Sequence, residues 1–419
     1  MLHFADLHFH SKYSRAVSPH MSLDGLNAGA KVKGLTILGT GDFTHPLWFK
    51  ELAQRLRPDE TSPGFYRLSS HPDSVRFMLT CEVSTIWSTP NGVKKVHHIL
   101  HVPSLEQAAQ INDVLSKRGN LMADGRPTFG KTSPAELVAL ARSVSKDVVV
   151  VPAHVWTPWF SVFGSNSGFD SVEQGYADQA RHIFALETGM SSTPAMNWRI
   201  SKLDRFALMS NSDSHSNHPW RLGRECNAFE FSEDPDGGRA ADALSFSSLW
   251  ASVRQKDSRH FKFTIETPPE YGKYHWDGHR ACDFSSAPAE TKKRGGVCPV
   301  CKKPLTIGVQ YRVDALADRP PGFRPKNAIP FKTLLPLHEL LSAVLGMGLA
   351  AKKVQACADA LIAKSGTELS VLLDLPQADA AAIGGPAFAA ALMQNRTGTI
   401  DVTPGFDGQY GVPRLRKAA

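Results

Sequence analysis

Histidine and acidic residues recur in the first half of the chain at spacings that could hold divalent metal ions. Asp6, His8 and His10 alternate in the stretch DLHFH, so a strand over residues 4–10 would place all three side chains on one face. Histidine nitrogen and carboxylate oxygen are ligands for zinc and similar borderline metals. An HxH pair alone does not establish a metal site, so its meaning depends on partners elsewhere in the sequence.

Such partners follow almost every apolar run of the first 230 residues. They are Asp42 and His45, Glu82, the histidines 97, 98 and 101, His154, Glu187, and Asp213 with His215. A single histidine at a strand end is usually held by a hydrogen bond and has no chemical role. Repetition at six or more strand ends instead favours a cluster of ions with bridging carboxylates such as Glu82 or Asp213.

Short apolar strands that alternate with helices must position these side chains. Strands are predicted at residues 34–41, 75–83, 96–102, 147–154, 182–188 and 205–213. Residues 133–144 predict a helix with a Ser133–Glu136 capping box, and Asn91-Gly92 predicts a hairpin turn. The runs LTIL and VVVV are apolar on both faces, which indicates parallel strands covered by helices. We expect an α/β fold of the β/α-barrel type, whose strand carboxyl ends gather the candidate ligands.

Six motifs follow one another along the chain: DLHFHSKYS, GTGDFTH, the Glu82 strand, HHIL, PAH and SDSH. Their order resembles that of the PHP (polymerase and histidinol phosphatase) family of metal-dependent phosphoesterases. The resemblance covers residues 1–230. It implies a distorted (β/α)7 barrel with two or three divalent ions, zinc alone or with magnesium or manganese, at its mouth. It also implies ligand sets, with Asp213, Glu82 and His215 as catalytic residues. These sets are His8, His10, Glu82 and Asp213 for one ion, Glu82, His98 and His154 for a second, and His45 with His215 for a third.

The sequence departs from the family pattern at two places, and both fall on the third site. Ser14 stands where many members have a further His or Asp, and the usual Asp-His pair is stretched to Asp42-Phe-Thr-His45. His97 is an alternative to His98, because neighbours along a strand point to opposite faces. No Ser/His/Asp constellation or nucleotide-binding GxxxxGK[ST] motif is present, so phosphoester hydrolysis by metal-activated water is the expected reaction.

A second metal-binding pattern lies further along the chain. His279-x2-Cys282 and Cys298-x2-Cys301 have the spacing of a zinc finger, with His275 as a spare fourth ligand. The chain has six cysteines, and three of them fall in this short segment, which favours a structural zinc over disulfides or a redox pair. The basic residues Lys292, Lys293, Arg294, Lys302 and Lys303 surround these ligands.

Positive charge is concentrated around this finger. Residues 270–326 contain 11 Lys or Arg against 6 Asp or Glu, in a chain of net charge +7. This excess suits contact with the phosphate backbone of a nucleic acid, although a solvated surface would look the same in sequence. The basic finger therefore favours a nucleic acid over a small phosphorylated molecule as the substrate.

The sequence predicts four segments: a barrel over residues 1–230, a connector over 231–270, a zinc-binding module over 271–325 and a mainly helical domain over 326–419. Composition, with 42% hydrophobic and 21% charged residues, is ordinary for a globular protein. No apolar run is long enough for a membrane helix, and the first residues do not resemble a signal peptide. We therefore expect no membrane partner and a cytoplasmic, nucleoid-associated location.

The barrel, the stretch from KYHWDGHRAC to VDALADRP and the tail PGFDGQYG together resemble endonuclease Q, a family of PHP-domain DNA repair endonucleases. This resemblance implies cleavage on the 5′ side of hypoxanthine, uracil, xanthine or an abasic site in double- or single-stranded DNA, leaving 3′-hydroxyl and 5′-phosphate ends. A sliding clamp is a conceivable partner, but no clamp-binding peptide is visible. The chain has no helicase P-loop, which argues against helicase activity.

A lesion-specific nuclease must expose its target base, which aromatic side chains then receive. Six aromatic residues follow the metal motifs directly: Trp48, Phe49, Trp156, Trp159, Phe160 and Trp220. Each could equally belong to the hydrophobic core. Two other functions stay open: a PHP-type phosphatase acting on a small phosphomonoester, which leaves the finger unused, and a catalytically silent DNA-binding protein.

Overall fold

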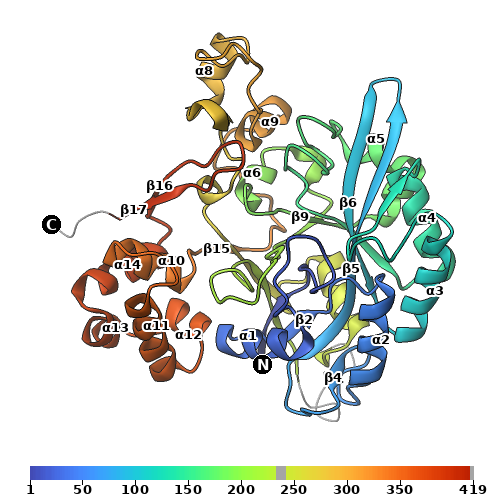
Figure 1. Cartoon of the computed structure of the whole chain (residues 1–419), viewed down its shortest axis with the longest axis horizontal. Helices are drawn as coiled ribbons and strands as arrows, with labels where there is room; N and C mark the ends of the chain where they lie inside the picture. The colour runs from blue at the N-terminus through green and yellow to red at the C-terminus, as the bar shows by residue number, and fades with distance from the viewer. Residues whose placement is uncertain (233–241, 416–419) are drawn as a thin grey trace.

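The computed structural model describes residues 1–232 and 242–415 (Figure 1). A mixed sheet forms the centre of the first domain, in the order β15-β12-β11-β1-β2-β5-β4-β3, with β6 and β7 on β5 and β8 on β6. Its strands before the connector are β1 (Leu2–Asp6), β2 (Ile37–Gly39), β3 (Leu56–Pro58), β4 (Tyr66–Leu68), β5 (Arg76–Thr89), β6 (Gly92–Val102), β7 (Thr128–Gly130), β8 (Val149–Pro152) and β11 (Cys226–Glu230). A separate parallel pair consists of β9 (Ala185–Glu187) and β10 (Ala207–Met209).

Helices fill the connections between these strands, as expected for an α/β fold. They are α1 (Leu23–Lys33), α2 (Pro46–Arg55), α3 (Leu105–Ser116), α4 (Pro134–Val144), α5 (Val172–Tyr176) and α6 (Pro194–Asn197). The capping box at the start of α4 is present, since the Ser133 hydroxyl accepts from Glu136 N–H and the Glu136 carboxylate accepts from Ser133 N–H. All six predicted strands are present. The α/β fold class is thus confirmed.

Hydrogen bonds draw the carboxyl ends of several strands to one mouth. Val155 N–H donates to the Glu187 carbonyl at 3.0 Å and so links β8 to β9. After β10, Ser212 N–H donates to Asp6, and Leu7 N–H donates to Asn211 Oδ1 at 2.9 Å. These bonds connect β10 to β1, so residues that follow distant strands meet at one end of the sheet.

Two sequence predictions about the strands were wrong. β1 ends at Asp6, so His8 and His10 lie beyond the strand, although Phe9 still forms a bridge with Ser214. The VVVV strand, β8, pairs antiparallel to β6, because the β5–β6 hairpin inserts a reversed strand between β5 and β8. An apolar strand buried on both faces is therefore not evidence of parallel pairing by itself. Figure 1 shows this hairpin projecting far from the sheet.

Part of the segment predicted as a connector, residues 231–270, belongs to the main sheet. It contributes α7 (Phe246–Gln255) and β12 (Phe261–Glu266), and β12 pairs with β11 and with β15 (Phe331–Thr333). Ile265 and Phe261 are buried, which explains why FKFTIE forms a strand and not a linker. The turn-rich stretch at residues 233–241 lies outside the described residues.

The cysteine-rich segment forms a small body that stands apart from the sheet in Figure 1. Its elements are β13 (Asp277–His279), β14 (Phe284–Ser286), α8 (Pro288–Lys293) and α9 (Val309–Leu316). A helical domain follows, with α10 (Leu337–Leu345), α11 (Lys352–Ser365), α12 (Glu368–Leu373), α13 (Gln377–Gly384) and α14 (Pro386–Arg396). The last part of the segment predicted as mainly helical, residues 326–419, contains a strand pair, β16 (Asp401–Thr403) and β17 (Val412–Arg414).

A buried ion pair fastens the helical domain to the first domain. Lys33 Nζ at the end of α1 lies 2.6 Å from Glu368 Oε1 at the start of α12, and both side chains are buried. Glu368 Oε1 also accepts from Leu337 N–H at the start of α10. Loss of one partner from such a pair leaves a buried charge unbalanced, which typically costs about 3–5 kcal/mol. None of the described helices combines the length and apolar character needed to cross a membrane.

Candidate metal centre

Four side chains from three distant parts of the chain converge where the strands end. The ligand atoms of His8, His10, Glu82 and Asp213 all lie within 4.8 Å of one another. His10 Nε2 is 3.2 Å from Glu82 Oε2 and 3.3 Å from Asp213 Oδ1, and His8 Nε2 is 3.6 Å from Glu82 Oε1. The structure therefore brings together the residues that the sequence proposed for the first ion.

The free atoms of this group fit a divalent ion. His8 Nε2, His10 Nε2 and Asp213 Oδ1 are buried and accept or donate no hydrogen bond within the described residues. Buried polar atoms are nearly always paired, so three such atoms without a hydrogen-bond partner that lie close together fit the ligands of a cation. Two imidazoles and two carboxylates are a suitable ligand set for zinc or manganese.

A second group shares Glu82 with the first. Glu82, His97 and His154 have ligand atoms within 4.8 Å of one another. His97 Nδ1 lies 2.7 Å and His154 Nε2 lies 3.1 Å from Glu82 Oε1. A carboxylate that contacts both groups is placed to bridge two ions.

The prediction that His98 belongs to this second group was wrong. Its ring faces the other side of β6, where Nε2 lies 2.9 Å from the Thr85 hydroxyl and Nδ1 lies 2.9 Å from the Tyr176 hydroxyl. Strand alternation allows only one of the two neighbours to face Glu82, and the structure selects His97. Burial lowers the pKa of His97 to about 4, so its ring is neutral and able to ligate a metal at pH 7.

The third predicted pair, His45 and His215, lies in two different surroundings. In the described part of the chain no candidate ligand group includes either residue. His45 precedes α2 and stacks on Tyr13, with the ring centroids 4.5 Å apart. His215 lies beside the first group, because its ring is 4.7 Å from that of His10 and its Nδ1 is 3.0 Å from the Asp213 carbonyl.

Carboxylates behind the ligands hold the histidine rings. Both oxygens of Glu187 lie 3.0 Å from His8 Nδ1, and Glu187 Oε2 also accepts from His154 N–H. Asp42 Oδ1 lies 3.1 Å from His10 Nδ1, and its other oxygen accepts from the hydroxyls of Ser11 and Ser14. Carboxylates of this kind fix the ring orientation and strengthen the ligand. Ser14, which departs from the family pattern, therefore supports Asp42.

Arg126 is a site residue that the sequence analysis missed. Its Nη1 lies 3.1 Å from Glu82 Oε2, and no motif surrounds it in the sequence. Burial opposes ionisation of Glu82, but His97, Arg126 and His8 hold the pKa of this carboxyl well below its ordinary value. Glu82 is thus a carboxylate at neutral pH.

The backbone is strained at three residues of the site. Asp42, His154 and Asp213 have φ angles of 47°, 30° and 45°. Such left-handed conformations cost a non-glycine residue about 1–3 kcal/mol and persist where surrounding contacts impose them. The three residues lie two to four positions beyond the ends of β8, β2 and β10, and their strained backbone has no signature in the sequence.

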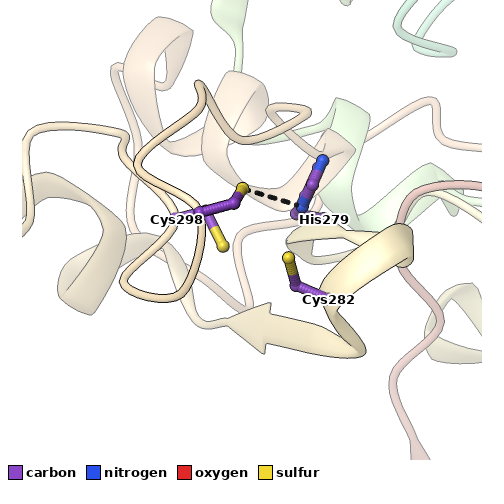
Figure 2. Close-up of side chains that lie close together, drawn as sticks. His279, Cys282 and Cys298 are labelled. Carbon is purple, nitrogen blue, oxygen red and sulfur yellow. Dashed lines mark hydrogen bonds between the residues drawn. The ribbon is translucent and has the colours of Figure 1, made fainter.

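The cysteine-rich segment also forms a compact ligand group. His279, Cys282, Cys298 and Cys301 have ligand atoms within 4.8 Å of one another, and Figure 2 shows His279, Cys282 and Cys298 pointing toward a common centre. Cys301 Sγ is 3.4 Å from His279 Nδ1. This closed four-ligand set suits a tetrahedral structural zinc. His275, the spare candidate, is buried elsewhere, with Nδ1 facing the Ser191 carbonyl.

The five basic residues of the finger are all exposed. Lys292 lies over the Tyr311 ring at 5.2 Å, and Lys293 pairs with Glu290 at 2.8 Å. Lys302 Nζ donates to the Pro299 carbonyl. Most of their charge therefore faces solvent, where it is available to a polyanion.

The aromatic candidates for a base pocket lie in different surroundings. Trp48 and Trp156 are 0% and 1% exposed and donate to the Thr40 carbonyl and to Asn197 Oδ1. Both side chains belong to the core, so the prediction that they line a base pocket was wrong. A large indole near a strand end can also pack beneath the site. Phe49 packs partly buried against the same core, and Trp220 stacks on His218. Trp159 is 39% exposed.

A cavity of about 760 Å³ opens beside the metal-binding groups. His97, His154, Asp213 and His215 line one part of it, and Trp159 and Phe160 line another. Of the six predicted aromatic residues, Trp159 and Phe160 lie on its wall. The cavity gives a substrate access to the ligand groups.

Comparisons with known proteins agree with this architecture. Residues 336–399 match the family model of the MJ0043 C-terminal domain. The uncharacterized protein MJ0043 of Methanocaldococcus jannaschii is 33% identical over 261 residues, which are 61% of this chain. The match covers only 31% of the length of that relative.

Two solved structures match the whole chain. The lesion-specific endonuclease PfuEndoQ from Pyrococcus furiosus is 30% identical, with a TM-score of 0.85 over 100% of this chain and 96% of its own. A complex of endonuclease Q with a 27-mer duplex substrate that has an abasic lesion at the active site gives the same identity and TM-score, over 97% of its chain.

The α/β fold, its metal-binding groups and the added cysteine-rich and helical parts define a PHP-type metal-dependent nuclease. The match in fold and sequence extends over the cysteine-rich segment and the helical domain as well as the sheet. The chain belongs to the endonuclease Q family.

Proposed function

We propose that this protein is a DNA repair endonuclease that hydrolyses the phosphodiester on the 5′ side of a deaminated base (hypoxanthine, uracil or xanthine) or of an abasic site. The observation that carries the proposal is the position of Glu82. This one carboxylate contacts both histidine groups at the edge of a cavity large enough for a nucleotide. Family membership and the abasic lesion in the related complex support DNA as the substrate.

The residues of the two groups would hold the ions of this reaction. His8, His10, Glu82 and Asp213 would bind one ion, and Glu82, His97 and His154 a second. A divalent ion bound there lowers the pKa of water and neutralises charge that develops on a phosphate. Glu187 and Asp42 orient His8 and His10, and Arg126 sets the position of Glu82.

His215 is proposed to contact the substrate, and not to hold a third ion. It lines the cavity next to Asp213, and its Nδ1 faces the Asp213 carbonyl, which leaves Nε2 for a partner. The zinc-binding module, with its exposed lysines, would contact DNA phosphates outside the cavity. The resulting products would carry 3′-hydroxyl and 5′-phosphate ends.

The test is a nicking assay on labelled duplexes that differ at one position. Duplexes with uracil, hypoxanthine, xanthine or an abasic site should be cut 5′ of the lesion, and the undamaged duplex should not. Chelator should abolish cutting, and zinc, manganese or magnesium should restore it. Extension of the product by a polymerase would verify the 3′-hydroxyl end. Hydrolysis of p-nitrophenyl phosphate without any cutting of lesion-bearing DNA would replace the proposal with a small-molecule phosphatase.

A further inference from the structure

The cavity beside the metal-binding groups has a cationic part that the proposed chemistry does not use. Arg221, Arg224 and Lys273 surround Tyr410, and all four line the cavity. Lys273 Nζ is 4.7 Å and the Arg221 guanidinium carbon is 5.0 Å from the centre of the Tyr410 ring. Arg224 Nη1 donates to the Tyr410 hydroxyl at 3.4 Å.

The positive charge of this cluster is only partly balanced. Arg221 Nη1 lies 3.5 Å from Glu339, whereas Arg224 and Lys273 form no ion pair within residues 1–232 and 242–415. Burial would raise the pKa of Tyr410, but Arg224, Arg221 and Lys273 together lower it. An anion would therefore be attracted to this side of the cavity.

Arg224 joins the cluster to the catalytic mouth. Its Nε and Nη2 donate to the Ser212 carbonyl at 3.2 and 2.9 Å, and Asp213 is the next residue. The cluster and the first metal-binding group are thus neighbours across a single peptide. An anion bound at the cluster would have a fixed position relative to Asp213.

Close backbone contacts hold Tyr410 in the cavity wall. Gly411 N–H donates to the Tyr271 carbonyl at 3.0 Å, and Gly405 N–H donates to the Glu270 carbonyl at 2.8 Å. A Cβ atom at Gly411 would lie 2.2 Å from the Glu270 oxygen, so only glycine permits this approach. The glycines of the tail thereby fix a side chain that is far from the metal ligands in the sequence.

We propose that Arg221, Arg224, Lys273 and Tyr410 bind the phosphate on the 3′ side of the lesion nucleotide while the metal-binding groups act on the phosphate on its 5′ side. Each nucleotide within a strand has a phosphate on both sides, and guanidinium, ammonium and phenol groups are ordinary phosphate donors. This inference rests on the proposed endonuclease function. It explains how lesions with different bases could be cut at the same place, because a phosphate contact does not read the base.

The experiment tests whether the Lys273 side chain contacts the phosphate 3′ of the lesion nucleotide. A uracil-containing duplex is prepared with a single uncharged methylphosphonate in place of the phosphate 3′ of the uridine. Lys273 is exposed, so Lys273→Ala should leave the fold intact. Dissociation constants are measured by fluorescence anisotropy with chelator present, and single-turnover nicking is measured with metal.

On the ordinary duplex, Lys273→Ala should bind on the order of 10-fold more weakly than wild type, as expected for a lost hydrogen bond to a charged group. Wild type should lose a similar factor on the methylphosphonate duplex. The variant should lose little more on that duplex, because the same contact is already absent. Tyr410→Phe, which keeps the ring, should give a smaller loss of the same kind. Lys31→Ala, an exposed lysine that does not line the cavity, serves as the matched control.

Two results would overturn the inference. One is that the losses from Lys273→Ala and from the methylphosphonate multiply, which would mean independent contacts. The other is that the affinity lost by Lys273→Ala multiplies with that lost from a methylphosphonate 3′ of the uridine, but not with that lost from a methylphosphonate elsewhere in the duplex. Both outcomes leave wild-type nicking intact. Failure of wild type to cut any lesion-bearing duplex would instead reject the proposed function itself.

Discussion

The Nδ1 atom of His97 lies 2.7 Å from Oε1 of Glu82. The next side chain, His98, points the opposite way and joins the hydroxyls of Thr85 and Tyr176 in the core. Two adjacent histidines on one strand thus have different roles, which substitution of each can separate.

His97→Ala should remove a ligand of the second group and lower bound metal by one ion per chain, with unfolding little changed. His98→Ala should keep the metal but leave the buried Tyr176 hydroxyl unpaired, at a cost of about 1–3 kcal/mol in unfolding free energy. Metal analysis and urea unfolding of both variants check this pair. Retained metal in His97→Ala together with lost metal in His98→Ala would reverse the assignment.

Asp213→Asn should abolish nicking while DNA binding is kept. Asp213 has a φ of 45°, and asparagine tolerates this left-handed conformation better than most residues, so the backbone should not change. The amide is a poor replacement for a carboxylate ligand, and nicking should fall by about 10²-fold or more. Nicking and gel-shift binding of one purified sample are compared. A variant that cuts at the wild-type rate would remove Asp213 from the mechanism.

Cys298→Ser should release the zinc of the finger without unfolding the first domain. The four ligands form a closed set on a body of its own, separate from the two groups at the catalytic mouth. We expect one zinc fewer per chain, weaker DNA binding and an unchanged main unfolding transition. Cys357→Ser, a partly exposed cysteine of α11 outside the ligand set, is the matched control. Equal zinc content in the two variants would contradict the assignment.

Replacement of Lys292, Lys293 and Arg294 by alanine should weaken binding to damaged and undamaged DNA equally. These exposed residues would touch phosphates, and each such contact contributes about 0.9 to the slope of log K against log salt. The slope should therefore become shallower by roughly 1 to 3. Binding is measured over a series of salt concentrations on both duplexes. A loss confined to damaged DNA would place these residues at the lesion.

Glu266→Gln should stabilise the protein at alkaline but not at acidic pH. Burial, with repulsion from Glu225, raises the pKa of Glu266 from 4.5 to about 8. The folded state therefore holds a proton that the unfolded state loses above pH 4.5, so wild-type stability falls as pH rises from 4.5 to 8. The neutral glutamine avoids this loss, and Thr264 and Thr188 can still bond to it.

The expected gain in unfolding free energy is at least about 1 kcal/mol at pH 8. A difference of one between the pKa values of the folded and unfolded states corresponds to about 1.4 kcal/mol. Urea unfolding at pH 4.5 and pH 8 measures it. Parallel stability–pH curves for the variant and wild type would show that Glu266 ionises normally in the folded state.

The sequence was sufficient to predict the residues that follow the strands, because strand ends and ligand types are both local features. The structure brings His8, His10, Glu82, His154 and Asp213 together as the sequence predicted, and likewise the four candidate ligands of the finger. The sequence did not predict Arg126, which reaches Glu82 only through folding and belongs to no motif. The choice of His98 over His97 failed because the alternation of a strand gives two faces but does not say which one points inward.

Longer-range geometry also explains the remaining differences. Trp48 and Trp156 follow metal motifs as a pocket residue would, but packing beneath the site places them in the core. Residues 231–270 contain prolines and a turn-rich stretch that suggested a connector, whereas β12 is held by pairing with β11 and β15. Neither β11 nor β15 is adjacent to β12 in the sequence, so the local pattern does not reveal the pairing.

The arrangement of β1 has a consequence for the order in which the protein can become active during its synthesis. β1 pairs with β11, and Phe9 forms its bridge with Ser214. His8 and His10 can therefore take their final positions only after residues 214–230 have been synthesised. Once that segment has left the ribosome, both groups that contact Glu82 are complete in composition. Tyr410 follows only after the finger and the helical domain have emerged. A growing chain would thus contain all the candidate ligands of both groups before it contains Tyr410, the last part of the cationic cluster that we propose binds DNA.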